Sequence, residues 1–188
     1  MKNLKFGVLF SFLLLAVAVE LTAQDVYSVK SHEVVISGTS NIHDWTVKVV
    51  DLTGSAKKTT EAVNDVNITV DAKTLLSSKG SIMDGKMQEA LKTESYPKIY
   101  YKSLTCKILS ENNGVIKISS TGNLTISGVT KSITVTSTCK PAQNENLEVS
   151  GSFYLLMTDF GIEPPTALFG SLETADKVTV SYKIVLQK

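Results

Sequence analysis

The stretch IKISSTGNLTISGVTKSITV, residues 116–135, decides the fold class of this chain. Ile116, Ile118, Leu124 and Ile126 share one parity, and the alternation resumes around Ile133 after Ser127-Gly128. Period two is the pattern of a β-strand with one buried face, and a Gly-containing dipeptide between two such runs indicates a tight turn. The stretch therefore predicts two antiparallel strands joined by a hairpin.

The same alternation recurs along the rest of the chain. Further turn signals stand at Asn112-Asn113-Gly114 and from Pro141 to Asn146. The segment from Ile99 to Ile108 changes parity midway, and a β-bulge near Ser103 would reconcile its two halves. The other alternating sets are Tyr27 and Val29; Val34, Ile36 and Gly38; Trp45, Val47 and Val49; Val66, Ile68 and Val70; Leu147, Val149, Phe153 and Leu155; and Val178, Val180, Tyr182, Ile184 and Leu186.

These segments predict an all-β domain. Val, Ile and Thr supply 48 of the residues from position 24 onward, and β-branched side chains favour strands. About eight long strands joined mostly by hairpins favour an eight-stranded antiparallel up-and-down barrel. One short helix interrupts them. Asp84 is its expected N-cap, Met83, Met87, Ala90 and Leu91 recur at helical spacing, and Ser95-Tyr96-Pro97 ends it.

The first 23 residues have the pattern of a signal peptide. Lys2 and Lys5 precede an uncharged run from Phe6 to Val19, which is too short for a bilayer span of about 20 residues. We expect a mature chain of one domain, residues 24–188, although a cut after Ala18 also fits. No cysteine lies near the cut, so no lipid anchor is expected. No later apolar stretch approaches the length of a bilayer span, so no stable membrane span is expected either. The protein is expected to be periplasmic or secreted.

The charge balance excludes one class of partner. The expected mature chain has 17 Lys and 17 Asp plus Glu, and the sequence contains no Arg. Nucleic-acid binding depends on a basic excess and on the forked contacts of Arg. We therefore expect no nucleic-acid partner.

Small residues stand where a filled barrel would carry large apolar ones. They fall at inward parity in mid-strand. Two interpretations stay open, because such residues either leave room for a small ligand in the lumen or relieve bends in the strands. The residues are Ser103, Ser120, Gly122, Ser137 and Gly151.

Catalytic and metal sites are weakly indicated. His43 and Asp44 lie in GTSNIHDWT, residues 38–46, where a turn that brings Trp45 into the core is a better interpretation than a catalytic pair. A metal site would need His32, His43 and a carboxylate such as Glu33, without any recognised ligand spacing. We expect no enzyme activity, no catalytic residue and no metal.

The two cysteines are expected to be free. Cys106 and Cys139 fall on strands that a third strand separates, which puts them roughly 9–10 Å apart in the pairing direction. A disulfide needs Cα atoms within about 7 Å.

Five motifs, in a fixed order, carry a family resemblance. They are a segment starting near His32; MDGKMQEALKTESYPKIYY, residues 83–101; GNLTISGVTKSITV, residues 122–135; DFGI, residues 159–162; and DKVTVSYKI, residues 176–184. Together they resemble the YceI-like family of exported, lipocalin-like barrels described as polyisoprenoid-binding. Residues 38–46 depart from the usual pattern of that family and resemble a subgroup with Asn-x-His-Asp-Trp.

The resemblance implies a barrel with an apolar tunnel for an isoprenoid or quinone-type chain, and no cofactor beyond that lipid. A protein-interaction module with a filled barrel is the alternative, and the oligomeric state, a dimer included, stays open. Lys79, Lys86 and Lys131 are candidates for contacts with a phosphorylated head group at the rim. The candidate ligand-binding residues in the lumen and at its mouth are Trp45, Met83, Met87, Tyr101, Ile118, Ile133, Val135, Phe153, Phe160, Phe169 and Tyr182.

Overall fold

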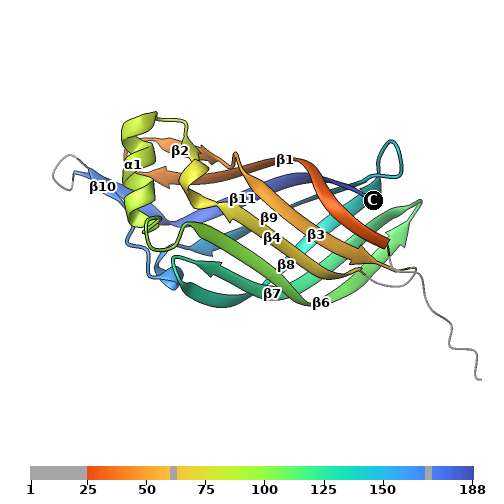
Figure 1. The fold of residues 1–188 in the computed structure, drawn as a ribbon. Coiled ribbons are helices and arrows are strands. Elements are labelled where there is room, and N and C mark those ends of the chain that lie inside the picture. Colours follow the sequence, from red (N-terminus) through yellow and green to blue (C-terminus); the bar gives the residue numbers. More distant parts are fainter. Residues whose placement is uncertain (1–24, 60–62, 168–170) are drawn as a thin grey trace, which may run out of the picture.

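The first and last long strands of the chain pair with each other, and this pairing closes one sheet into a barrel (Figure 1). The computed structural model describes residues 25–59, 63–167 and 171–188. Neighbouring strands are antiparallel and follow chain order around the barrel, so the predicted eight-stranded up-and-down architecture is confirmed. The strands are β1 (Asp25–Ser40), β2 (Asp44–Lys48), β3 (Leu52–Lys58), β4 (Val63–Asp71), β5 (Leu76–Ser77), β6 (Lys98–Asn112), β7 (Val115–Ile126), β8 (Val129–Pro141), β9 (Leu147–Leu156), β10 (Thr166–Ala167) and β11 (Leu172–Gln187).

Two short strands share one position in the barrel wall. β2 pairs with residues 35–39 of β1, and β3 pairs with residues 25–28 of the same strand. Residues 49–51 connect them, so β2 and β3 act together as one long, interrupted strand. The short strands β5 and β10 extend the sheet beyond the closed wall.

Two hairpins have the turns that the sequence predicts. The central residues Asn113-Gly114 join β6 to β7 with φ angles of 50° and 77°. Ser127-Gly128 joins β7 to β8 with φ angles of 50° and 79°. Positive φ at both central positions defines a type I′ turn, whose twist matches that of the flanking strands.

The predicted bulge in β6 is confirmed. The register against β7 shifts between Ser103 and Thr105, and Leu104 is 62% exposed there. The ladder between β4 and β6 ends at the pair Asn67–Lys102, and the next amide, that of Val66, donates to Ser103 Oγ at 2.9 Å. At the bulge, the Ser103 hydroxyl therefore accepts the hydrogen bond that a backbone carbonyl of β6 would accept in a regular ladder.

The helix α1 (Ser81–Ala90) lies at one end of the barrel (Figure 1). Asp84 is not its N-cap as expected: Gly80 is the capping residue, and Asp84 lies in the first turn. Its carboxylate accepts a hydrogen bond from the Ser77 amide at 2.6 Å, which ties the helix to β5. After the helix, the Leu91 carbonyl accepts a hydrogen bond from Ser127 Oγ at 2.9 Å, so the β7–β8 turn is also attached to this segment.

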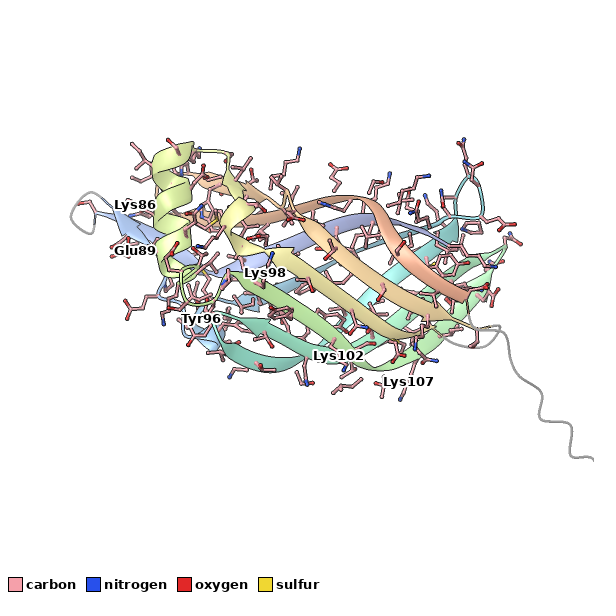
Figure 2. The ribbon with its side chains drawn as sticks, in the orientation of Figure 1. Lys86, Glu89, Tyr96, Lys98, Lys102 and Lys107 are labelled. Carbon is pink, nitrogen blue, oxygen red and sulfur yellow. The ribbon has the colours of Figure 1, made fainter. Side chains whose placement is uncertain are left out.

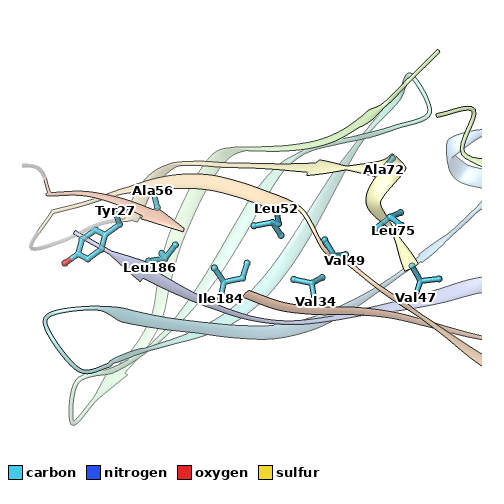
Figure 3. Close-up of a cluster of buried hydrophobic side chains, with 10 residues drawn as sticks. All are labelled: Tyr27, Val34, Val47, Val49, Leu52, Ala56, Ala72, Leu75, Ile184 and Leu186. Carbon is cyan, nitrogen blue, oxygen red and sulfur yellow. The ribbon is translucent and has the colours of Figure 1, made fainter. Parts of the chain in front are cut away.

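The inner face of the barrel carries two apolar clusters, while Lys102 and Lys107 point outward from β6 (Figure 2). Ile36, Trp45 and Ile99 contact both clusters and join them. The buried residues of the first cluster, drawn in Figure 3, are Tyr27, Val34, Val47, Val49, Leu52, Ala56, Ala72, Leu75, Ile184 and Leu186. Those of the second are Leu124, Ile126, Met157, Phe160, Ile162 and Val178.

Candidate functional site

An apolar cavity of about 420 Å³ runs along the inside of the barrel. At the end of the barrel next to α1, Met83 and Met87 line the cavity. At the other end of the barrel, Tyr27 lines it near the start of β1 and Cys139 near the end of β8. Both apolar clusters contribute to its wall. The volume lies in the range of small-molecule sites, which span roughly 300–1,000 Å³.

The inward glycines seat aromatic rings. A Cβ atom at Gly122 would lie 2.8 Å from Tyr101 Cζ, and one at Gly151 would lie 2.7 Å from Tyr182 Cζ. A Cβ atom at Gly122 would also clash with the Lys102 carbonyl oxygen, and one at Gly151 would lie 2.8 Å from the Thr136 carbonyl oxygen. Glycine is therefore required at both positions because the backbone of a neighbouring strand and a tyrosine ring both come close. The sequence left two explanations for the small residues, and the structure adds this third one beside a lumen that does contain a cavity.

Each of these two rings ends in a hydrogen bond to a serine on a nearby strand. Tyr101 Oη lies 2.6 Å from Ser120 Oγ, and Tyr182 Oη lies 2.6 Å from Ser137 Oγ. Burial raises the pKa of both phenols above the ordinary value of 10.0. Both tyrosines are consequently neutral hydroxyl groups at physiological pH.

The cationic side chains that line the cavity are lysines. Lys79 and Lys86 line the end near α1, beside His43, and Lys58 lines the wall where β3 ends. Among the described residues that line the cavity, none has a carboxylate side chain. The Lys residues stand at the two ends of the cavity, and the wall between them is apolar except for hydroxyl and thiol groups.

The family of the chain follows from its sequence match. The model of the YceI-like domain matches residues 18–186. The chain belongs to the YceI-like family. No curated protein matches this YceI-like chain.

Solved structures of the same fold include other YceI proteins at low identity. BcnA of Burkholderia cenocepacia superposes with a TM-score of 0.66 at 18% identity, covering 82% of this chain and 95% of BcnA. A polyisoprenoid-binding domain from Saccharophagus degradans, implicated in plant cell wall breakdown, gives 0.68 at 14% identity, covering 86% and 97%. The Campylobacter jejuni YceI protein gives 0.55 at 14% identity, covering 100% and 99%. At these identities the likeness establishes the fold that the YceI-like chain shares with them.

Most of the candidate ligand-binding residues of this YceI-like chain line the cavity. They come from β2, α1 and the five strands from β6 to β11 that form the wall. The sequence pattern missed Leu75, which is 1% exposed and lines the same cavity from the segment between η1 (Ala72–Thr74) and β5, where no alternation exists to reveal it. The candidates that line the cavity are Trp45, Met83, Met87, Tyr101, Ile118, Ile133, Val135, Phe153 and Tyr182.

Two candidates are placed differently. Phe160 is not at the mouth: it is 2% exposed and packs in the second apolar cluster, outside the cavity lining. It ends the short helix η2 (Thr158–Phe160), and Gly161, with φ of 66°, reverses the chain directly after it. Phe169 lies outside the described residues. Of the three candidate lysines, Lys79 and Lys86 line the cavity and Lys131 does not.

The segment around His43 forms a turn. Ser40 Oγ lies 3.3 Å from His43 Nδ1, but it donates to the His43 carbonyl at 2.7 Å and accepts from the amide of His43 at 3.1 Å. The Ser40 hydroxyl hydrogen is thus engaged by the backbone. This arrangement matches the preferred interpretation of the sequence, a turn from which Trp45 enters the core.

His32 and the cysteines complete the candidates. His32 lies opposite Ile184 in the β1–β11 ladder, and its Nδ1 is buried without a hydrogen-bond partner in the described part of the chain. No group of three metal-binding side chains occurs among the described residues.

Cys106 and Cys139 are free, as predicted, on strands separated by β7. No helix in residues 25–59, 63–167 and 171–188 is long and apolar enough to span a bilayer.

Proposed function

We propose that this YceI-like chain binds a lipid with an isoprenoid- or quinone-type chain inside its barrel, as an exported protein that serves in carriage or storage of the lipid or in protection of the envelope against stress. The observation that supports this most directly is the predominantly apolar lining of the 420 Å³ cavity. The Saccharophagus degradans relative, which has the same fold, is a polyisoprenoid-binding domain.

The energetics of an apolar chain suit such a cavity. Each buried CH₂ group contributes roughly 0.8 kcal/mol, so two or three five-carbon units contribute about 8–12 kcal/mol, which offsets most of an association cost of about 4–15 kcal/mol. The flexible side chains of Met83 and Met87 at the helix end adapt to chains of different shape. A chain that enters the lumen therefore needs no charged contact to bind.

Export is part of this proposal. The signal-like segment before residue 24, with its basic start and short apolar run, supports secretion to the periplasm or beyond. The free thiol of Cys139 is compatible with that location because the residue is 3% exposed, and burial raises the pKa of the thiol, which lowers its reactivity.

The alternative, an interaction module with a filled barrel, has less support. A barrel packed by its own side chains would leave no connected apolar space of this size. A catalytic role also has little support, because the Ser40–His43 contact belongs to a backbone-bonded turn.

The test is the lipid content of the purified protein. Residues 24–188 are exported from a bacterial host that makes polyprenyls and quinones, purified without detergent and extracted with organic solvent for mass spectrometry. We expect one class of isoprenoid lipid at near-equimolar ratio. An unrelated exported protein, purified in the same way, controls for lipid carried along nonspecifically. A lipid-free chain that also fails to take up added apolar chains would contradict the proposal.

A further inference from the structure

Four hydroxyl groups cross the wall of the cavity at mid-height. Ser120 on β7 lies opposite Val135 on β8, two residues before Ser137, so the two serines are diagonal neighbours with Cα atoms roughly 7–8 Å apart. Tyr101 reaches Ser120 from β6, and Tyr182 reaches Ser137 from β11, across Gly151 of β9. We call Tyr101, Ser120, Ser137 and Tyr182 the hydroxyl belt. All four residues line the cavity.

The hydroxyl belt lies between two apolar regions. Tyr101 packs against the second apolar cluster and Tyr182 against the first. Ile133 and Leu124 line the cavity on the helix side of the belt, and Ile118 and Val149 line it on the other side. A polar group in such a position is costly unless it forms hydrogen bonds. The chain nevertheless places four of them there, with the Tyr101 ring over Gly122 and the Tyr182 ring over Gly151.

The belt has more donors than its own acceptors use. Each Tyr–Ser pair holds two hydroxyl hydrogens but makes one hydrogen bond, so one hydrogen in each pair remains. The other hydrogen bond that the described residues make with the belt comes from Cys106 Sγ, which donates to Ser120 Oγ at 3.5 Å and leaves the spare hydroxyl hydrogen of that pair unused. Since burial raises the pKa of both phenols, the tyrosine hydroxyls keep their hydrogens.

We propose that the hydroxyl belt hydrogen-bonds a neutral oxygen atom of the bound chain, such as a ketone or ester carbonyl, and that the lumen therefore prefers a chain with this oxygen to a plain hydrocarbon. The oxygen is neutral because a buried anion would face apolar walls and hydroxyl groups, while Lys58, Lys79 and Lys86 line the ends of the cavity. This inference rests on the proposed function, because it concerns a chain that already occupies the lumen.

The experiment compares two matched branched chains, pristane and phytone, which differ only where a ketone oxygen replaces a methyl branch. Both are titrated as competitors of a fluorescent apolar reporter, N-phenyl-1-naphthylamine, bound to the purified chain. The variant carries Tyr101→Phe, Ser120→Ala, Ser137→Ala and Tyr182→Phe, which keep both rings over their glycines and remove all four hydroxyls of the belt, so that no serine hydroxyl can take over the hydrogen bond. We expect phytone affinity to fall about fivefold to tenfold for each hydrogen bond lost, with pristane affinity unchanged.

Comparing the ratio of the two affinities between variant and wild type cancels the different water solubilities of the two chains. Tyr100→Phe, a change of the same chemistry at an exposed position of β6, serves as the control and should leave the ratio unchanged. If the fourfold variant does not fold, the two half variants, Tyr101→Phe with Ser120→Ala and Ser137→Ala with Tyr182→Phe, should each give part of the effect. An unchanged ratio in the folded variants overturns the inference while leaving the proposed function intact. If neither chain displaces the reporter from the wild type, the proposed function itself fails.

Discussion

The indole ring of Trp45 covers Gly38, its direct partner across the β1–β2 ladder. A Cβ atom at Gly38 would lie 2.7 Å from Cε2 and 2.9 Å from Cη2 of the ring. The indole Nε1 donates to the Thr39 carbonyl at 3.3 Å, which fixes the ring in this place. The ring then lines the cavity and joins the two apolar clusters, so the glycine determines how the tryptophan contributes to the site.

Gly38→Ala is expected to destabilise the protein by about 1–3 kcal/mol, because the new methyl group displaces the Trp45 ring. Urea denaturation followed by the fluorescence of Trp45, the single tryptophan of the chain, measures the change. Gly85→Ala is the control, since a Cβ there meets no atom within 4 Å. Within α1 it should stabilise by roughly 0.5–1 kcal/mol. Equal effects of the two substitutions would contradict the steric explanation.

Val149→Phe is expected to block the lumen. Val149 lines the cavity from β9, and a larger ring there occupies space that a bound chain would need. We expect the affinity for N-phenyl-1-naphthylamine to fall by about tenfold or more, which corresponds to losing at least 1.4 kcal/mol of binding free energy. Ser150→Val, on the opposite face of the same strand, should leave the affinity unchanged. Undiminished binding by a folded Val149→Phe variant would mean that the reporter binds elsewhere.

Acid is expected to loosen the loop that holds Phe160. The hydrogen bonds from Thr158 Oγ1, at 2.6 Å, and from the Thr158 amide, at 2.9 Å, lower the pKa of the Asp176 carboxyl below its ordinary 3.8. A lowered folded-state pKa stabilises the protein above pH 3.8, and the contribution is lost as the pH falls through the folded-state value. Melting temperatures between pH 7 and pH 3 should therefore decline at the acid end.

Asp176→Asn should melt at a lower temperature than the wild type at pH 7, and the two curves should converge at low pH. Asp159→Asn, an exposed change in the same turn, serves as the control. A constant gap between wild type and Asp176→Asn over the whole range would show that ionisation of Asp176 contributes nothing.

His32→Leu is expected to stabilise the barrel. His32 Nδ1 is buried without a partner among the described residues, and an unsatisfied buried polar atom costs about 1–3 kcal/mol. Leucine of similar size removes that cost, so the unfolding free energy in urea should rise by roughly 1–2 kcal/mol. His43→Leu, in the exposed turn, should change it by less than about 0.5 kcal/mol. A destabilised His32→Leu variant would indicate that the imidazole has a bonding role.

The sequence predicted the barrel because the parity of its strands is a local property. The bulge at Ser103 was predictable for the same reason, since the two halves of β6 disagree in parity and one extra residue repairs the register. The break between β2 and β3 left no such signal. The alternation of Trp45, Val47 and Val49 continues into the connection between β2 and β3. The break depends instead on β1, which pairs with β2 along residues 35–39 and with β3 along residues 25–28.

The alternation of the strands predicted which side chains face the lumen, but not which partners those side chains contact. Alternation places Tyr101 and Tyr182 on the inner face. Their serine partners depend on the register between neighbouring strands, and the sequence of a single strand does not reveal that register. Phe160 shows the same limit in a loop, where Gly161 rather than any period decides that the ring turns into the core. The prediction of Asp84 as the N-cap was wrong because its carboxylate accepts a hydrogen bond from the Ser77 amide, which lies outside the helix. The sequence alone does not show this contact.

The pairing of β1 with β11 determines when the protein can fold. Ser28 pairs with Gln187, so the sheet closes only after nearly the whole chain is available. Until then β1 has one unpaired edge, and the growing sheet has another at its newest strand. Contacts so distant in sequence make folding slow, and open strand edges invite pairing with other chains. Synthesis and folding of this protein are therefore separated in time, and the unfolded chain needs protection from aggregation until its last strand arrives.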